Sequence, residues 1–260
     1  MDRLVWKSTM NIKEYARLFL EAVRQSDYSV ALTGAGVSTD SGIPDFRSPN
    51  GLYSKISQET FELDFFLNQP QEYYKIAIDY IHPLADKEPN ITHQMLATLQ
   101  TQNLLDAIIT QNIDGLHQKA GATNVIEFHG NVTGFHCIHC GKTFDRAYVD
   151  EQIRTNQVPY CQCQSLIRPD IVFFGDMIPQ ESLTAAQLSS GSAKVFIVMG
   201  TSLQVHPAAG MASLARRCGA RLFIINREPT AMDTLADWVC HTELTAFSQA
   251  VMDIMTNNGD

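Results

Sequence analysis

The sequence predicts an α/β fold in which a parallel sheet is covered by helices on both faces, with two insertions forming a smaller domain. Short, continuously apolar runs alternate with segments of helical periodicity over most of the 260 residues. This pattern is typical of parallel strands that are buried on both faces. Two regions interrupt it. Residues 52–82 have helical periodicity without a strand, and residues 131–168 contain four of the six cysteines.

The expected elements follow from the apolar residues. The first helix lies within 11–26, where one stripe holds Ile12, Tyr15, Ala16, Phe19, Leu20 and Val23. Strands are expected within 29–36, 104–110, 125–128, 170–175, 194–201, 221–226 and 237–240. Further helices are expected within 181–189, 207–219 and 243–255.

These elements suggest three units. The large sheet domain would comprise residues 1–51, 83–130 and 169–260. Residues 52–82 would be a helical insertion, and residues 131–168 a hairpin-rich, zinc-binding insertion; together the two insertions would form the small domain. The ligand crevice of such a sheet is expected at the carboxyl ends of its strands.

Composition argues against several partners and locations. The net charge of −9 and pI of about 5.3 leave no basic surface for nucleic acid or for an anionic membrane. The N-terminal residues lack a continuous apolar signal core, and no apolar run approaches the ~20 residues that cross a bilayer. A cytoplasmic protein is expected, in which the six cysteines are free thiols or metal ligands.

The glycines of "VALTGAGVSTDSGIPDFRS" (30–48) suggest a phosphate-binding loop. Gly34 and Gly36 follow an expected strand, where glycine lets backbone N–H groups approach a pyrophosphate. The fingerprint is partial, because Thr39 replaces its third glycine and no acidic residue follows a clear second strand. A plain turn before a helix would also explain the glycines. The polar residues that follow, with the Asp45-Phe46-Arg47 sequence, favour a loop that closes over a ligand.

Four further polar clusters stand at expected strand ends. They are Gln111, Asn112 and Asp114; His129; residues 200–207; and residues 226–228. With the glycine loop they make five clusters at one edge of the sheet, which suggests a single extended ligand.

The cysteines of the second insertion have the spacing of a metal site. Cys137 and Cys140 form a C-x2-C pair, and Cys161 and Cys163 form a C-x-C pair. Four thiolates can close a tetrahedral structural zinc site. The short second pair leaves alternatives open, namely a ligand from His136 or His139, or a metal-free module. Cys218 and Cys240 are expected to be ordinary buried thiols.

The motifs "GAGVSTDSGIPDFR", "TQNIDGLH", "HG", the cysteine pairs, "RPDIVFFGD", "GTSLQVHP" and "NRE" occur in the order seen in sirtuins, the NAD-dependent protein-lysine deacylases. The chain resembles this family from about residue 30 to about residue 244. The second cysteine pair is one residue shorter than is usual there. The resemblance implies a Rossmann-like large domain with NAD extended across the strand ends, and one structural zinc ion.

The resemblance also implies roles for individual residues. The residues expected to bind NAD are Gly34, Ala35, Gly36, Thr39, Asp45, Phe46, Arg47, Gln111, Asn112, Ile113, Asp114, His129, Gly200, Thr201, Ser202, Asn226, Arg227, Glu228 and Leu244. The substrate peptide would add as a strand beside Val172, Phe173, Phe174 and Gly175. Asn112 and His129 would be catalytic, with His129 as general base.

The resemblance implies transfer of an acyl group from lysine to ADP-ribose, with release of nicotinamide. Some sirtuins that prefer acidic acyl groups use a Tyr and an Arg three residues apart; here Tyr53 is followed by Lys55 and Ile56, which favours neutral acyl groups. Acyl-lysine proteins are the expected partners of a monomer. The alternatives are a mono-ADP-ribosyltransferase, a non-catalytic NAD- or ADP-ribose-binding module, and a hydride-transferring dehydrogenase.

Overall fold

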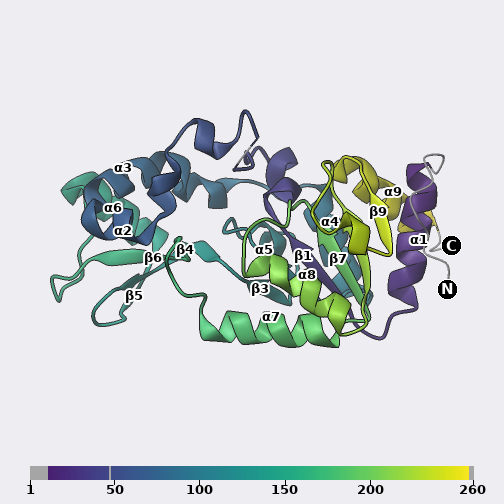
Figure 1. The fold of residues 1–260 in the computed structure, drawn as a ribbon. Helices are drawn as coiled ribbons and strands as arrows, with labels where there is room; N and C mark the ends of the chain where they lie inside the picture. Colours follow the sequence, from purple (N-terminus) through teal and green to yellow (C-terminus); the bar gives the residue numbers. More distant parts are fainter. Residues whose placement is uncertain (1–10, 47, 258–260) are drawn as a thin grey trace.

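A parallel sheet of six strands forms the larger part of the molecule (Figure 1). The structure is a computed structural model that describes residues 11–46 and 48–257. The strand order is β3-β2-β1-β7-β8-β9, and every pairing in it is parallel. The strands are β1 (Ser29–Thr33), β2 (Ala107–Thr110), β3 (Val125–Glu127), β7 (Val195–Met199), β8 (Arg221–Ile225) and β9 (Trp238–Cys240). All six lie within expected runs, so the predicted α/β class is confirmed.

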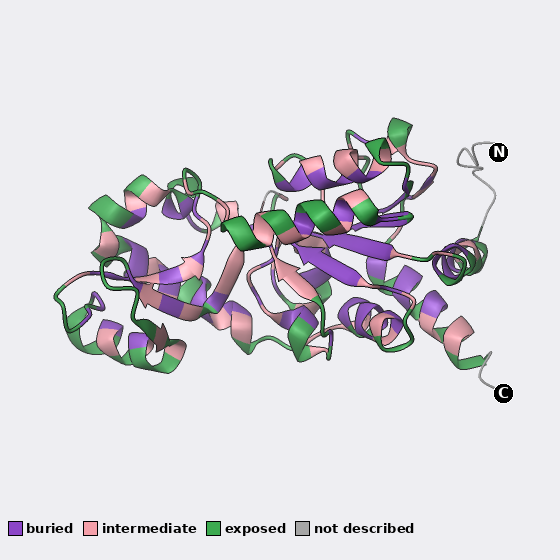
Figure 2. Ribbon diagram, turned by 90° about the horizontal axis from the view of Figure 1, so that it is seen from below, coloured by how far each residue is buried: buried purple, intermediate pink, exposed green. Residues whose placement is uncertain are grey.

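Helices cover both faces of this sheet. On one face lie α1 (Ile12–Arg24), α4 (Ile91–Thr101) and α9 (Leu244–Asn257); on the other lie α7 (Gln180–Ser192) and α8 (Ala208–Arg217). Successive strand residues point to opposite faces, so Ala31 packs in the first core while Val30 and Leu32 pack in the second. Figure 2 shows the result, a sheet buried between helices that are exposed only on their outer sides.

The smaller part is built on an antiparallel sheet of order β5-β4-β6, with strands β4 (Gly130–Cys137), β5 (Thr143–Asp145) and β6 (Ile167–Ile171). Helices α2 (Leu63–Asn68), α3 (Pro70–Tyr80) and α6 (Arg146–Asn156) pack with it at the left of Figure 1. Its core is rich in aromatic side chains, including the fully buried Phe66, Tyr73, Tyr74 and Phe135. Helix α6, like α4, was not predicted from the sequence.

The expected strand at 170–175 is confirmed at its first two residues only, and these belong to the antiparallel sheet rather than to the parallel one. Asp170 and Ile171 end the antiparallel strand β6, and the chain then leaves the sheet. The Phe174 N–H donates to the Phe61 carbonyl at 2.7 Å, and the Leu63 N–H donates to the Phe174 carbonyl at 3.0 Å. An apolar run does not reveal which partner its backbone will find, so periodicity could not separate this segment from the parallel strands.

The three-unit division of the chain stays a prediction. The core of the small sheet gathers residues from both expected insertions, but it also includes Ile43 and Leu116 from outside them. Leu116 begins the short helix α5 (Leu116–Lys119), which lies between the two cores. Among the described residues, no helix combines the length and the apolar character needed to cross a membrane.

Candidate active site at the carboxyl edge of the parallel sheet

One cavity of about 560 Å³ collects nearly all the predicted site residues. It lies where the strands β1, β2, β7 and β8 end and where segments of the small domain approach them. The predicted residues that line it are Gly34, Ala35, Gly36, Thr39, Asp45, Phe46, Gln111, Asn112, Ile113, His129, Val172, Phe173, Phe174, Gly175, Gly200, Thr201, Ser202, Asn226, Arg227, Glu228 and Leu244. Asp114 lies behind the wall, and Arg47 lies outside the described residues.

The glycines at this edge let two strand-end loops touch. The Gly36 N–H donates to the Gly200 carbonyl at 2.8 Å, and a Cβ on Gly36 would lie 2.8 Å from the Gly200 Cα. A Cβ on Gly34 would lie 2.6 Å from the Thr201 Cβ. Gly200 itself has φ +63°, and its Cβ would meet the Val37 nitrogen at 2.6 Å. Close approach of the loops after β1 and β7 therefore requires glycine, whatever the ligand.

The buried Ser38 fixes the side chains of Asn112 and Asp114 through hydrogen bonds. Ser38 donates to Asp114 Oδ2 at 2.7 Å and accepts a hydrogen bond from Asn112 Nδ2 at 3.0 Å. The Leu116 N–H donates to Asp114 Oδ1 at 2.9 Å. Burial raises the pKa of Asp114, and hydrogen bonds from Leu116, Ser38 and Asn112 oppose that rise. Asp114 therefore anchors the wall of the cavity rather than facing into it.

His129 presents a basic nitrogen to the site. Its Nδ1 lies 3.0 Å from the Gln111 carbonyl, which can only accept, so Nδ1 carries the proton and Nε2 keeps its lone pair. Burial lowers the pKa of His129, and the bond to Gln111 partly offsets this. The imidazole is therefore neutral at pH 7, the form that a general base requires.

Segment 172–175 offers its backbone and one exposed ring. The Val172 N–H donates to the His129 carbonyl at 2.9 Å, which fixes the segment beside the candidate base. The Phe173 side chain turns into the small-domain core, where it stacks on Phe66 at 5.1 Å between ring centres. Phe174 is 42% exposed. A ligand in the cavity can thus contact Phe173 through its backbone only.

The opposite wall of the cavity is aromatic. The ring of Phe46 lies 5.5 Å from that of Tyr53 and 5.6 Å from that of Phe61, measured between centres. All three line the cavity. Ile56 is buried and Lys55 is exposed. This wall therefore presents apolar surface rather than a cation to whatever binds beside Phe46.

The far end of the cavity is polar. The Asn226 side chain donates to the Glu228 carbonyl at 2.6 Å, and the Arg227 guanidinium lies 3.4 Å from the Glu228 carboxylate. Gln111 donates to the Thr201 hydroxyl at 3.1 Å, which joins the ends of β2 and β7. Leu244 is buried at the start of α9. This end offers hydroxyl and carboxylate groups of the kind that hold a ribose.

The four predicted zinc ligands form one cluster. The sulfur atoms of Cys137, Cys140, Cys161 and Cys163 all lie within 4.8 Å of one another. The closest pairs are 3.4, 3.6 and 3.7 Å apart. Sulfurs bound tetrahedrally at ~2.3 Å from zinc lie ~3.8 Å apart, so the cluster fits one structural zinc ion. The shorter C-x-C pair thus brings both thiols into place.

The surroundings act differently on two thiols of the cluster. A hydrogen bond from the Lys142 backbone lowers the pKa of the Cys140 thiol, but the neighbouring Cys137 and Cys161 thiols together raise it by more, to about 11. The Cys140 N–H donates to Cys137 Sγ, and this is the largest influence that lowers the pKa of the Cys137 thiol to about 6. His136 is paired with Asp170 instead of pointing to the sulfurs.

All six cysteines are free. Cys218 is exposed, which contradicts its expected burial, whereas Cys240 is buried and its pKa is raised to about 12 by that burial.

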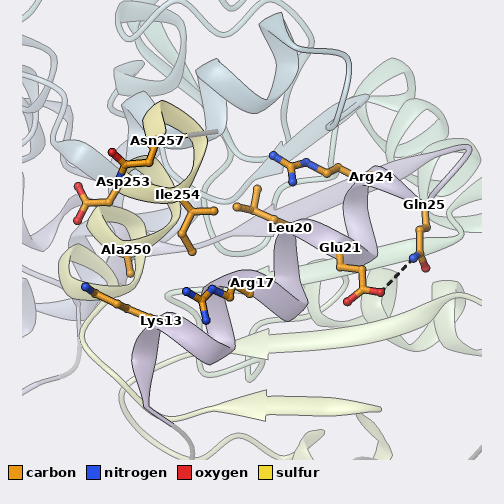
Figure 3. Close-up of a pocket in the computed structure, with 10 residues that line it drawn as sticks. All are labelled: Lys13, Arg17, Leu20, Glu21, Arg24, Gln25, Ala250, Asp253, Ile254 and Asn257. Carbon is orange, nitrogen blue, oxygen red and sulfur yellow. Dashed lines mark hydrogen bonds between the residues drawn. The ribbon is translucent and has the colours of Figure 1, made fainter. Parts of the chain in front are cut away.

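A second cavity of about 520 Å³ lies between α1 and α9 (Figure 3). None of the predicted site residues lines it. Its charged lining, including Lys13, Arg17, Arg24 and Asp253, is exposed. Figure 3 shows that Gln25, which caps α1, donates a hydrogen bond to Glu21 of that helix, so this bond runs along the rim of the groove and does not cross it. With no buried polar group directed into it, this groove lacks the features of the first cavity.

Two buried histidines near the site were not singled out from the sequence. His93 on α4 contacts Ser38, and His117 on α5 contacts the Thr33 hydroxyl. Their rings lie 4.9 Å apart, and both are buried. The one local signal was Asn90, three residues before His93, in the position of a helix N-cap.

The chain is similar in sequence to known deacetylases. The Sir2 family profile matches residues 34–207. The NAD-dependent protein deacetylase of Thermotoga maritima is 44% identical over 245 residues, which are 94% of this chain and 98% of that protein. The NAD-dependent protein deacetylase 1 of Pyrobaculum aerophilum is 42% identical over 218 residues, 84% of this chain and 85% of that protein.

Solved structures agree with this. A Sir2 complex with a p53 peptide and NAD+ has a TM-score of 0.89 and 42% identity, covering 95% of this chain and 100% of that one. A Sir2Tm complex with a propionylated peptide has a TM-score of 0.87 and 42% identity, covering 95% and 99%. A Sir2 histidine-to-alanine variant with a deacetylated p53 peptide and 3'-O-acetyl ADP ribose has a TM-score of 0.89 and 43% identity, covering 94% and 98%.

Proposed function

Since this chain belongs to the Sir2 family, we propose that it is an NAD-dependent deacetylase of acyl-lysine side chains in proteins. The observation that carries the proposal is the position of His129. Its neutral imidazole, held through Nδ1 by Gln111, lies between the glycine loops of the sheet edge and segment 172–175. A cofactor and a peptide would have to meet at this point for such a transfer.

The glycine loops would receive the diphosphate of NAD. Gly34, Gly36 and Gly200 leave this edge without side chains, which lets a diphosphate approach the backbone closely. Their own N–H groups donate to the Met199, Gly200 and Ile225 carbonyls, so the diphosphate would be held by other N–H and hydroxyl groups of the two loops. The nicotinamide end would lie toward Ile113 and Asn112, and the adenosine end toward Ser202, Asn226 and Glu228. Arg227 and Leu244 would complete that end. The acyl-lysine would enter beside Val172 and Phe174, with its peptide added as a strand.

The chemistry would use NAD as a substrate. The acyl oxygen attacks the ribose carbon as the bond to nicotinamide breaks. His129 Nε2 takes a proton from a ribose hydroxyl, and that oxygen attacks the acyl carbon. Water then completes release of the lysine amine and of O-acyl-ADP-ribose. Phe46, packed against Tyr53 and Phe61, would keep water away before the acyl group arrives.

We propose that neutral acyl groups are preferred. The wall beside Phe46 is aromatic, and the two residues after Tyr53 and Ser54 are an exposed Lys55 and a buried Ile56. Burial of an acyl carboxylate there would leave its charge unpaired, which is costly. We also propose that the chain acts as a monomer in the cytoplasm, because one chain supplies the whole cavity and all six cysteines are free.

The test is product analysis. Acetyl-lysine peptide and NAD are incubated with the protein, and nicotinamide, free-lysine peptide and O-acetyl-ADP-ribose are measured by mass spectrometry. Equal amounts of the three products are expected, with none in the absence of NAD. A succinyl-lysine peptide of the same sequence is the matched control and should react more slowly.

Other results would identify a different activity. ADP-ribose attached to protein without loss of acetyl would make the chain a mono-ADP-ribosyltransferase. NAD binding without consumption would make it a binding module. Formation of NADH would make it a dehydrogenase.

A further inference from the structure

A buried polar network behind the cavity joins helix α4 to the site. His93 Nε2 lies 3.3 Å from the Ser38 oxygen, and Ser38 in turn contacts both Asp114 and Asn112. His93 and Ser38 are fully buried. No step of the proposed reaction uses His93, so its place in the network needs a separate explanation.

The tautomer of His93 follows from its other neighbour. The Asn90 N–H donates to His93 Nδ1 at 3.3 Å, in the reciprocal cap that begins α4. A nitrogen that accepts a hydrogen bond carries no proton, so the proton of the neutral ring lies on Nε2. Burial lowers the pKa of His93 to about 4, which keeps the ring neutral near pH 7. His93 therefore donates to Ser38.

This donation fixes the direction of the Ser38 hydroxyl. A serine hydroxyl has one proton and two acceptor positions. The acceptor positions are taken by His93 Nε2–H and by the Asn112 amide. The proton is left for the Asp114 carboxylate, 2.7 Å away, which can only accept. Each group in the chain from Asn90 to Asp114 thus has one orientation.

The same helix start holds the glycine loop. The Asn90 amide donates to the Val37 carbonyl at 2.8 Å and to the Ser41 hydroxyl at 3.0 Å. Both acceptors belong to the 3-10 helix Ala35–Ser41, which also contains Ser38. The first turn of α4 therefore contacts the loop proposed to lie against the diphosphate and, through Ser38, reaches Asn112, which is proposed to lie toward the nicotinamide end.

We propose that His93 is a positioning residue, which acts through Ser38 to hold Asn112 and Asp114 for the NAD step. The inference rests on the proposed function of the cavity, but it concerns a residue that touches neither NAD nor peptide. Removing the His93 donor frees the Ser38 hydroxyl to turn and leaves one of its acceptor positions empty. The cost appears in NAD binding and use rather than in peptide binding.

The test is a double-mutant cycle of His93→Phe and Ser38→Ala. Each single variant should lower kcat/KM for NAD about tenfold, the value of one well-buried hydrogen bond. KM for the acetyl peptide should stay within about twofold. The double variant should be no worse than Ser38→Ala alone, because Ser38 is the group through which His93 reaches Asn112 and Asp114. His93→Gln, which can return an N–H near the Nε2 position, should recover most of the loss.

A neighbour on the same helix provides the control. Thr92 is buried and its hydroxyl accepts from Ser248 of α9 at 3.1 Å, away from Ser38. Thr92→Val removes that bond at nearly constant volume, so it should lower the melting temperature and leave kcat/KM for NAD unchanged. If His93→Phe does not accumulate as folded protein, His93→Met, which fills irregular space, takes its place in the cycle.

Two results would overturn the proposal. One is additivity of the His93 and Ser38 effects in the cycle. The other is a His93→Phe phenotype that matches Thr92→Val, with lost stability and normal NAD kinetics. The dissociation constant for NAD, measured by calorimetry on the same four proteins, tests the coupling without activity. A parent that binds NAD but fails to deacetylate would reject the proposed function and leave this cycle interpretable.

Discussion

The two parts of the molecule build one cavity by different physical means. In the large sheet, strands β1, β2 and β7 are buried along their whole length between two helical layers. In the small domain, β4 buries only Val132, Phe135 and Cys137, over a single aromatic core. The sheet edge is shaped by backbone contacts at glycines, whereas the small domain ends in loops that meet at four cysteines.

This difference indicates which of the two walls of the cavity, the sheet edge or the small domain, requires a bound metal ion. The glycine edge is supported by hydrophobic burial on both faces of the sheet. The small domain has one core, and the loops around Cys137 and Cys161 are joined by sulfur atoms that repel one another as thiolates unless a cation binds them. Because segment 172–175 belongs to the small-domain core through Phe173, the peptide side of the cavity should depend on zinc.

Zinc removal should have the largest effect and should separate the two parts. A chelator, or Cys161→Ser, should unfold the small domain and reduce activity at least about a hundredfold, since structural zinc contributes ~10 kcal/mol to such folds. Calorimetry should then show the large domain melting alone. Metal analysis of the parent should give one zinc per chain.

The control for this prediction is Cys218→Ser, an exposed cysteine outside the cluster. It should keep its zinc and its activity. A fully folded and active parent without metal would mean that the two walls do not differ in this way.

Replacement of His129 tests the point where the two parts meet. His129→Ala should reduce kcat for deacetylation by about 10²–10⁴, the usual contribution of a general base. NAD binding should remain, since the glycine loops are untouched. Quenched-flow measurement of nicotinamide and O-acetyl-ADP-ribose gives the rate, and calorimetry gives the affinity. Undiminished turnover would remove His129 from the mechanism.

The close contact between the loops after β1 and β7, at Gly36 and Gly200, can be tested by adding one methyl group. Gly200→Ala should destabilise the protein by about 3 kcal/mol, because a left-handed φ and a Cβ 2.6 Å from the Val37 nitrogen both oppose it. Gly210→Ala in α8 is the matched control. Nothing lies within 4 Å of its Cβ, so it should stabilise the helix by about 0.5–1 kcal/mol. Urea unfolding of both variants measures the difference, and equal effects would contradict the assigned contact.

The smallest expected effect is the pH dependence of the buried histidines. Burial lowers the pKa of His93 to about 4 and of His117 to about 3, below the ~6.5 of an unfolded histidine. The unfolded chain therefore binds protons first on acidification. The stability that these rings contribute is present above pH ~6.5 and is lost as the pH falls toward 4, by up to about 1.4 kcal/mol per pH unit for each.

Urea unfolding at pH 7, 6 and 5 measures that slope. In His93→Gln the slope should fall by about 1.4 kcal/mol per pH unit, because one titrating ring is gone. The same slope in parent and variant would show that His93 is not buried as a neutral ring.

Sequence reasoning succeeded where the signal is local. The stripe of α1, the runs of β1 and β7, and the glycines that follow β1 depend on spacing within a few residues. The site residues at the strand ends could be gathered because parallel strands end at one edge. Sequence reasoning failed over most of 170–175, where the apolar run pairs outside the parallel sheet. It also missed His93, whose partner Ser38 lies 55 residues away in the chain.

The sequence by itself determined the fold class, the motif order that places the chain in its family, and the four cysteines as a set. Those properties depend on residue type and on spacing along the chain. Only the tertiary structure decided that Asp114 stands behind the cavity, that Phe173 turns away from it, and that a helix start orients Ser38. Hydrogen-bond direction and burial arise between segments that are distant in the chain, and they exist only once those segments are packed together.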